Sequence, residues 1–137
     1  MKILVGISGG VDSACAALEL MRSGHAVEGA ILKMHEYSDI DGAVRVAEAL
    51  GIPLHVIDAT ESFNNIIKEN LADEYLAGRT PNPCILCNEK VKFKGLCDFA
   101  VEQGFDCIAT GHYARIVKCG ERFAVAAASD GRKDQSY

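Results

Sequence analysis

The chain has 137 residues, of which 49% are hydrophobic and 24% charged, a composition typical of a globular domain with its own core. Its apolar runs are far shorter than the roughly 18 residues that a membrane span needs, so we expect no membrane association. The formal net charge is −5, but residues 1–78 carry five basic and twelve acidic side chains, whereas residues 79–137 carry nine basic and seven acidic ones. The second part is therefore better suited to contact a polyanion.

Predicted strands and helices alternate along the chain. In order, we expect a strand at 2–7, a helix at 14–23, a strand at 26–34, a helix at 41–50, a strand at 53–57, a helix at 61–77, a stiff proline-containing loop at 79–88, a helix at 88–103, a strand at 106–110 and a hairpin of strands at 116–119 and 122–126. This alternation predicts an α/β fold, a Rossmann-like parallel sheet flanked by helices, with ligands at the carboxyl ends of the strands.

The N-terminus does not resemble a secretory signal, because residues 1–7 run directly into a glycine-rich loop. We therefore expect a cytoplasmic protein, in which the six cysteines stay free of disulfides. Three of them, Cys15, Cys97 and Cys107, lie in apolar segments, and we expect them to be buried.

The loop Ser8-Gly9-Gly10-Val11-Asp12-Ser13 joins the first strand to the first helix. Backbone N–H groups at a helix start bind anions, and adjacent glycines let a phosphate approach the main chain closely. Ser8 and Ser13 add hydroxyl donors, and Asp12 is expected to cap the helix or to hold a Mg²⁺ ion bound to the phosphates. The loop has neither the lysine of a Walker motif nor the glycine spacing of a dinucleotide-binding motif. It indicates another kind of phosphate site.

The S-G-G-x-D-S pattern of this loop resembles the PP-loop ATP pyrophosphatases, which have the adenine nucleotide alpha-hydrolase type of fold. The resemblance implies that ATP, with Mg²⁺, is cleaved between its α and β phosphates. AMP would be left on the substrate, and pyrophosphate would be released.

Three further segments are similar to the tRNA 2-thiouridylases, the MnmA or TrmU family: residues 78–93, 109–113 and 133–137. The resemblance covers the whole chain. It implies that the C2 oxygen of a wobble uridine in tRNA is adenylated and then replaced by sulfur, which a sulfur-carrier or cysteine-desulfurase relay protein delivers. It also implies that residues 1–137 are the nucleotide-binding catalytic domain of a longer enzyme, whose central and C-terminal tRNA-binding domains and persulfide-carrying cysteine lie beyond this chain.

The same resemblance assigns roles to single positions. Cys87 takes the place of the catalytic cysteine, and a helix N-terminus just beyond it is expected to lower the pKa of its thiol. The positions that match the ATP site are Gly6, Ile7, Ser8, Gly9, Gly10, Val11, Asp12, Ser13, Leu32 and Gly111. The positions that match tRNA contacts are Asn82, Pro83, Cys84, Lys133, Asp134 and Gln135.

Cys84 departs from the family pattern, because many members carry Asp there. Cys84 and Cys87 could be a catalytic thiol with a neighbour that resolves or accepts sulfur, or two ligands of an iron–sulfur cluster whose third ligand lies outside this chain. A zinc site is disfavoured, because no second Cys-x-x-Cys or His pair follows at usable spacing.

Three other positions leave two interpretations each. His112 follows a strand end and is either a ligand contact or a polar residue packed under the loop. Lys90 and Lys94 share a helix face, which is either simply solvated or in contact with phosphate.

Two other functions fit these motifs less well. A PP-loop enzyme acting on a small molecule would leave the two-cysteine segment unexplained. A non-catalytic adenine-nucleotide-binding module would explain neither the loop's Ser8, Asp12 and Ser13 nor Cys87.

Overall fold

The structure is a computed structural model that describes residues 1–136. In chain order its elements are β1 (Lys2–Gly6), α1 (Val11–Arg22), β2 (Ala26–Lys33), α2 (Ile40–Leu50), β3 (Leu54–Asp58), α3 (Thr60–Phe63), the π-helical turn η1 (Asn64–Lys68), α4 (Glu69–Leu76), α5 (Pro83–Cys87), the π-helical turn η2 (Asn88–Phe93), α6 (Lys94–Glu102), β4 (Cys107–Thr110), β5 (Ala114–Cys119) and β6 (Arg122–Ala127).

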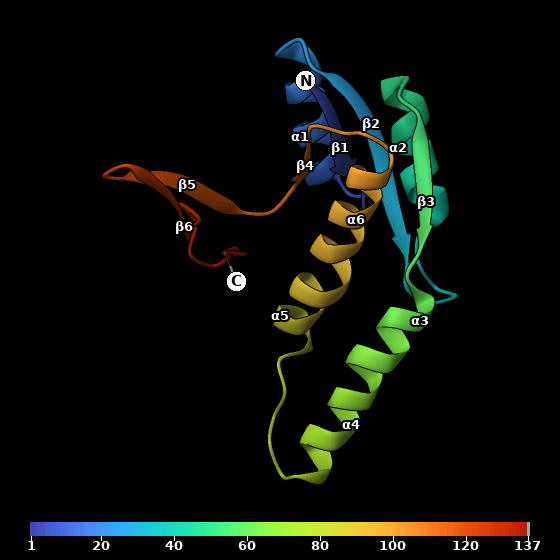
Figure 1. The fold of residues 1–137 in the computed structure, drawn as a ribbon, viewed down its shortest axis with the longest axis vertical. Coiled ribbons are helices and arrows are strands. Elements are labelled where there is room, and N and C mark those ends of the chain that lie inside the picture. Colours follow the sequence, from blue (N-terminus) through green and yellow to red (C-terminus); the bar gives the residue numbers. More distant parts are fainter. Residues whose placement is uncertain (137) are drawn as a thin grey trace.

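The main sheet has the strand order β3-β2-β1-β4, and all neighbouring strands are parallel (Figure 1). Its central strand β1 is apolar on both faces, and Ile3, Leu4 and Val5 are each no more than 3% exposed. Parallel sheets need such strands, because helices cover both of their faces. The predicted α/β fold with a parallel sheet is therefore confirmed.

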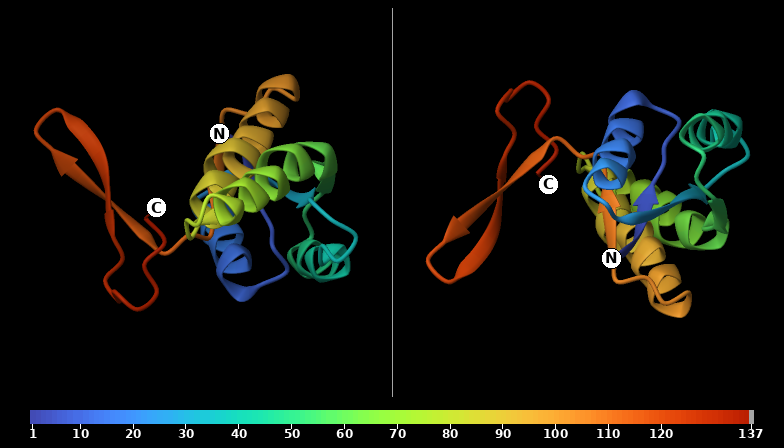
Figure 2. Two further views of the ribbon diagram at one scale, coloured as in Figure 1. Left: turned by 90° about the horizontal axis from the view of Figure 1, so that it is seen from below. Right: turned by 90° about the horizontal axis from the view of Figure 1, so that it is seen from above.

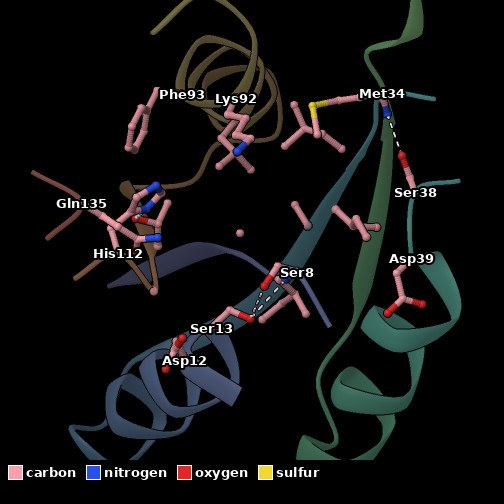
Figure 3. A pocket seen from close by; sticks show the side chains of 18 of the residues that line it. Ser8, Asp12, Ser13, Met34, Ser38, Asp39, Lys92, Phe93, His112 and Gln135 are labelled. Carbon is pink, nitrogen blue, oxygen red and sulfur yellow. Dashed lines mark hydrogen bonds between the residues drawn. The ribbon is translucent and has the colours of Figure 1, made fainter. Parts of the chain in front are cut away.

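Helices pack on the two faces of this sheet in separate groups (Figure 2). Val5 belongs to the core formed with α1 and α2, whereas Leu4 belongs to the core formed with η1, η2 and α6, since successive strand residues point to opposite faces. From β1 the chain crosses to β2 on one side, and it returns to β4 on the other side. Open α/β sheets bind ligands at such a point, beyond the carboxyl ends of the strands. Figure 3 shows the cavity that lies there.

Local sequence signals account for most element boundaries. For example, α2 begins where the Asp39 carboxylate accepts a hydrogen bond from the Gly42 N–H (2.9 Å), and it ends at Gly51, which has a left-handed φ of 67°. The first helix starts earlier than expected, at Val11, with Gly10 as its N-cap. The helix expected at 61–77 is present, with a π-helical turn in the middle.

The proline-containing segment is not the loop that we expected. Residues 83–87 form the short helix α5, which continues through η2 into α6. Asn82 is the N-cap of α5, and its side-chain oxygen accepts a hydrogen bond from the Cys84 N–H (3.2 Å). Pro83 fits the first helical position, because an N–H there would have no partner within the helix.

The expected burial of three cysteines is wrong for two of them. Cys15 and Cys97 are exposed, and Cys107 is half-buried. The helices α1 and α6 carry apolar residues around much of their circumference, so composition did not show which side faces the sheet. All six cysteines are free thiols, as expected.

β5 and β6 form the expected hairpin, which extends away from the main sheet (Figures 1 and 2). Ile116 pairs with Val125 across the hairpin, and Phe123 lies two residues further along the same face. All three are at least 60% exposed. Within residues 1–136 no helix combines the length and apolarity needed to cross a membrane.

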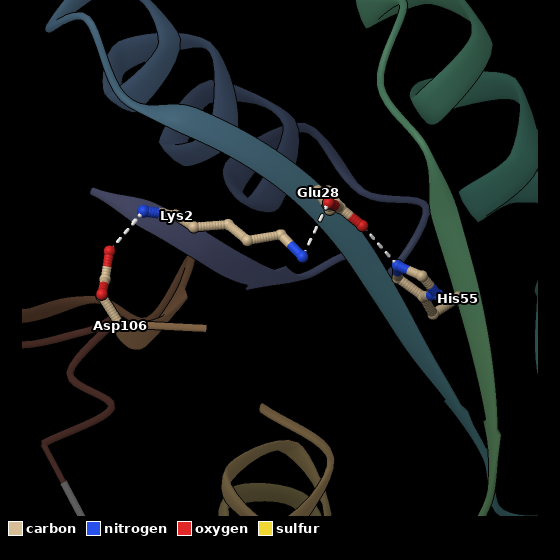
Figure 4. Close-up of polar contacts among 4 residues, drawn as sticks. All are labelled: Lys2, Glu28, His55 and Asp106. Atoms are coloured by element: carbon tan, nitrogen blue, oxygen red, sulfur yellow. Dashed lines mark hydrogen bonds and ion pairs between the residues drawn. The ribbon is translucent and has the colours of Figure 1, made fainter. Parts of the chain in front are cut away.

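An ion-pair chain lies at the opposite end of the sheet from the cavity (Figure 4). Glu28 bonds the His55 ring at 2.6 Å and pairs with the Lys2 ammonium at 3.2 Å, while the Lys2 N–H donates to Asp106 at 2.6 Å. The hydrogen bond from His55, and then the contact with Lys2, lower the pKa of Glu28 below its usual 4.5. These contacts of Glu28 therefore link β1, β2 and β3 through a carboxylate that is stabilised as an anion.

We expect Glu28→Gln to lower the free energy of unfolding at pH 7 by up to about 1 kcal/mol, a usual value for a partly exposed ion pair. Because the folded state depresses the pKa of Glu28, this stabilisation is present above pH 4.5 and is lost as the pH falls through the lower, folded-state pKa. Urea unfolding at pH 7 and pH 3 measures it, and the difference between wild type and variant should shrink at pH 3. The exposed Glu48→Gln is the control, and an equal effect of both variants would contradict the assignment.

Candidate nucleotide-binding site

The predicted phosphate loop forms a tight turn closed by Ser13. The buried Ser13 hydroxyl accepts a hydrogen bond from the Ser8 N–H (3.1 Å), donates to the Gly10 carbonyl (3.1 Å) and lies 3.2 Å from the Ser8 hydroxyl. Gly9 has a left-handed φ of 80°, and a Cβ there would lie 3.0 Å from the Asp39 carboxylate. The glycine is needed for both reasons, conformation and close approach to α2.

A cavity of about 450 Å³ opens above this loop, at the carboxyl ends of β1, β2 and β4 (Figure 3). The lining residues come from three longer segments, from the end of β4 with the turn after it, and from Gln135 near the C-terminus. They are Gly6, Ile7, Ser8, Asp12 and Ser13; Ala30, Ile31, Leu32, Met34, His35, Tyr37, Ser38 and Asp39; Lys92, Phe93 and Leu96; and Thr110, Gly111, His112 and Gln135.

The structure brings together seven of the ten predicted ATP positions around this cavity: Gly6, Ile7, Ser8, Asp12, Ser13, Leu32 and Gly111. The other three, Gly9, Gly10 and Val11, shape the loop without lining the cavity, and Val11 is 74% exposed. Size and lining suit a nucleotide, because ligand sites of this kind are mostly apolar with a few polar groups that fix orientation.

Gly111 holds the floor of the cavity close to α1. A Cβ at this position would lie 2.6 Å from the Ser13 nitrogen and 2.7 Å from the Asp12 carbonyl carbon. These are backbone atoms, so they cannot move aside as a flexible side chain would. The contact brings the turn after β4 directly against the first residues of the phosphate loop's helix.

Asp12 does not cap α1, contrary to one of the two roles expected for it, since the helix has no side-chain N-cap bond. Its carboxylate lines the cavity and accepts a hydrogen bond from the Tyr113 hydroxyl (2.9 Å). Its other oxygen, Oδ2, has no hydrogen-bond partner among residues 1–136. This arrangement suits the other expected role, holding a cation beside phosphates.

The environment of Cys87 differs from the one expected. Cys87 ends α5 inside a continuous helix, so no helix N-terminus lies just beyond it to favour a thiolate. The thiol is only 7% exposed, and burial raises its pKa, although the nearby Lys92 charge opposes this. Cys87 does not line the cavity, but its Sγ lies 3.9 Å from the Sδ of Met34, which does.

Cys84 and Cys87 do not form a metal site with other described residues. Cys84 is exposed and Cys87 buried, although both lie in α5. Nowhere in residues 1–136 do three or more His, Cys, Asp or Glu side chains come together in a way that could hold a metal ion. Two thiols alone are too few for an iron–sulfur cluster, so the donor set in this part of the chain does not fit one.

The other predicted tRNA segment, Lys133 to Gln135, folds back onto the residues after β4. Gln135 brackets Tyr113: its side chain accepts from the Tyr113 N–H (3.1 Å), and its own N–H donates to the Tyr113 carbonyl (2.8 Å). The Lys133 ammonium lies 5.1 Å above the Tyr113 ring. Asp134 accepts bonds from Ala128 and Ser136, which lower its pKa. A hydrogen-bonded chain therefore links this segment, through Tyr113, to Asp12 in the phosphate loop.

Sequence reasoning missed Lys92, which lines the cavity. The two lysines it considered are paired at the exposed surface instead, Lys90 with Glu89 and Lys94 with Asp98, each at 2.6 Å. Sequence reasoning could not place Lys92, because a loop was expected before residue 88, whereas the helix begins at Pro83 and passes through the π-helical turn that carries Lys92.

His112 lines the cavity, where it could contact a ligand. Its Nδ1 is 2.7 Å from the Thr110 hydroxyl, and its ring packs against Phe93 at 5.3 Å. Burial, and then the charge of Lys92, lower its pKa. A neutral imidazole is therefore favoured at neutral pH.

The parallel sheet, the loop and the cavity define a nucleotide-binding domain of the PP-loop, adenine nucleotide alpha-hydrolase type. The chain belongs to the tRNA methyl transferase HUP domain family, whose profile matches residues 1–137. It is 45% identical over 150 aligned residues to the tRNA-specific 2-thiouridylase MnmA of Treponema denticola. That alignment covers all of this chain and 41% of the relative, so the chain spans less than half the length of this relative.

Solved structures share the fold. A protein described as a predicted subunit of tRNA methyltransferase from Methanocaldococcus jannaschii is similar with a TM-score of 0.53 and 23% identity, over 81% of this chain and 52% of that one. The NH3-dependent NAD synthetase of Campylobacter jejuni is similar with a TM-score of 0.52 and 19% identity, over 81% and 47% of the two chains. At these identities the likeness concerns the fold alone.

Proposed function

We propose that residues 1–137 are the ATP-dependent catalytic domain of a tRNA-uridine 2-sulfurtransferase that acts in the cytoplasm. The observation that carries the proposal is the shared cavity: the Ser8–Ser13 loop forms one side, and the helix that bears Cys87 forms another. The full-length similarity of this chain to a tRNA-specific 2-thiouridylase names the substrate class. In this proposal the tRNA-binding domains belong to a longer protein of which this chain is part.

In the first step, the C2 oxygen of the wobble uridine attacks the α-phosphorus of ATP, and pyrophosphate leaves. The loop's N–H groups and its two serines would hold the departing phosphates, which helix N-termini favour. Asp12, with one oxygen free of Tyr113, would hold a Mg²⁺ ion that neutralises phosphate charge. Leu32 and Gly111 would contact the adenosine.

In the second step, the terminal sulfur of a persulfide, which a sulfur-carrier or desulfurase protein supplies, attacks C2, and AMP leaves with the original oxygen. The Cys87 thiolate would then attack the inner sulfur of that persulfide, so that the S–S bond breaks, 2-thiouridine is released, and Cys87 forms a disulfide with the carrier that an external thiol reduces. For the Cys87 Sγ to reach the cavity, the Met34 side chain must move, and the unbranched thioether can change rotamer easily. Asn82, Pro83 and Cys84, and the segment from Lys133 to Gln135, would contact the RNA.

Methyl transfer, which the family's name mentions, explains neither the pyrophosphate-binding loop nor the cysteine beside the cavity. The proposal uses Cys87 as a thiol and assigns no step to an iron–sulfur cluster, because Cys84 is exposed and Cys87 buried, which does not favour a shared ligand role. An enzyme acting on a small molecule is the second candidate, since the cavity itself is of ordinary ligand size.

The test uses a full-length protein that contains this domain, with ATP, Mg²⁺, a persulfide donor and unmodified tRNA. The proposal predicts 2-thiouridine in the RNA, found by mass spectrometry of its nucleosides, with one pyrophosphate released per thiouridine. Pyrophosphate release that is the same with and without tRNA would instead favour a small-molecule substrate.

A further inference from the structure

The cavity contains one cation that the phosphate loop does not supply. Of the described residues that line it, Lys92 is the only lysine or arginine. It projects from η2 on the side of the cavity away from Ser8 and Ser13 (Figure 3). The loop has no lysine of its own, although it is built to receive a phosphate chain.

Lys92 has no carboxylate partner, unlike its neighbours. Among residues 1–136, no Asp or Glu oxygen lies within ion-pair distance of its ammonium, whereas Lys90 and Lys94 both have partners at 2.6 Å. Asp12 and Asp39 also line the cavity, but each is already hydrogen-bonded within the protein, to Tyr113 and to Gly42. A half-buried ammonium without a partner favours an anionic ligand in its place.

The position of Lys92 also indicates which anion it would meet. Its charge opposes the rise that burial causes in the pKa of the Cys87 thiol, and it adds to the fall that burial causes in the pKa of His112, which also lines the cavity. Because the loop would hold the β and γ phosphates, the phosphate left for a cation on the opposite wall is the α-phosphate, which the uridine oxygen attacks.

We propose that Lys92 binds the α-phosphate of the nucleotide and of the adenylated intermediate. It thereby supplies, from the opposite wall, a positive charge that the phosphate loop itself does not carry. This inference rests on the proposed function, because it requires the cavity to hold ATP. The step that it assists changes no bond of Lys92, whose ammonium only offsets the charge that develops as pyrophosphate leaves.

The experiment measures binding of ATP, AMP, adenosine and pyrophosphate to the whole chain by calorimetry. We expect Lys92→Gln to weaken the binding of ATP and AMP by about tenfold to a hundredfold, which is the usual effect of losing a hydrogen bond to a charged group. Adenosine and pyrophosphate should bind within about twofold of wild type. Lys92→Arg should recover most of the lost affinity. Lys90 lies on the same helix but does not line the cavity, so Lys90→Gln should leave the binding of all four ligands unchanged.

Each outcome decides the inference. If Lys92→Gln binds ATP and AMP as tightly as the wild type does, the inference is wrong, while the proposed function is unaffected. If the affinity for adenosine falls as much as the affinity for ATP, the substitution has disturbed the structure of the site, and the inference is also wrong. A wild-type chain that binds neither ATP nor AMP overturns the proposed function together with the inference. Thermal unfolding of each variant confirms that it is folded.

Discussion

Gly111→Ala should weaken ATP binding by at least about tenfold and lower the free energy of unfolding by about 1–3 kcal/mol, the usual cost of overpacking. The added methyl group would lie 2.6 Å from the Ser13 nitrogen and 2.7 Å from the Asp12 carbonyl carbon. Either β4 or the start of α1 must then shift. Since the same backbone positions the phosphate loop, the shift moves its N–H groups away from where phosphate binds.

Gly131→Ala is the matched control, because a Cβ there meets nothing within 4 Å. Calorimetry with ATP gives the affinity, and urea unfolding gives the stability. If Gly111→Ala bound ATP as tightly as Gly131→Ala, the close contact between β4 and α1 would not control the loop.

Cys87→Ser, in a full-length enzyme, should reduce thiouridine formation by more than about a thousandfold, as removal of a nucleophile does elsewhere. Serine keeps the size of the side chain but does not ionise near neutral pH. Pyrophosphate release with tRNA should persist, because the adenylation step does not use the thiol. Single-turnover assays that count thiouridine and pyrophosphate separate the two steps.

The exposed Cys97→Ser serves as the control for this variant, and it should keep the wild-type rate. A fully active Cys87→Ser enzyme would show that another group handles the sulfur. Burial raises the pKa of the Cys87 thiol, so the thiolate fraction, and with it the sulfur-transfer rate, should rise as the pH increases through the alkaline range.

The parallel sheet and the phosphate loop could be predicted because their signals are local. A buried strand, two adjacent glycines and a helix start lie within thirteen residues, and short-range hydrogen bonds of Ser13 close the turn. The surroundings of Cys87 could not be predicted in this way. Two prolines suggested an extended loop, yet Asn82 and Pro83 together start a helix, which buries Cys87 and turns Lys92 into the cavity.

The burial of individual side chains could not be predicted from the sequence either. Cys15 and Cys97 lie among apolar neighbours in sequence, but the face that a helix presents to the sheet depends on how the whole helix packs. The same holds for the bonds of Tyr113 with Gln135 and with Asp12, which join residues 22 and 101 positions apart. No local pattern encodes such contacts.

The strand order has a consequence for how the chain folds. β1 can pair with β2 early, but its other edge stays open until β4, about a hundred residues later, is added. Pairings of such high sequence separation form slowly, and an open, apolar strand edge is prone to aggregate meanwhile. Because β4 also brings Gly111 against α1, the nucleotide site is completed only in that last step. We therefore expect ATP, which binds only the completed state, to raise the yield of refolding.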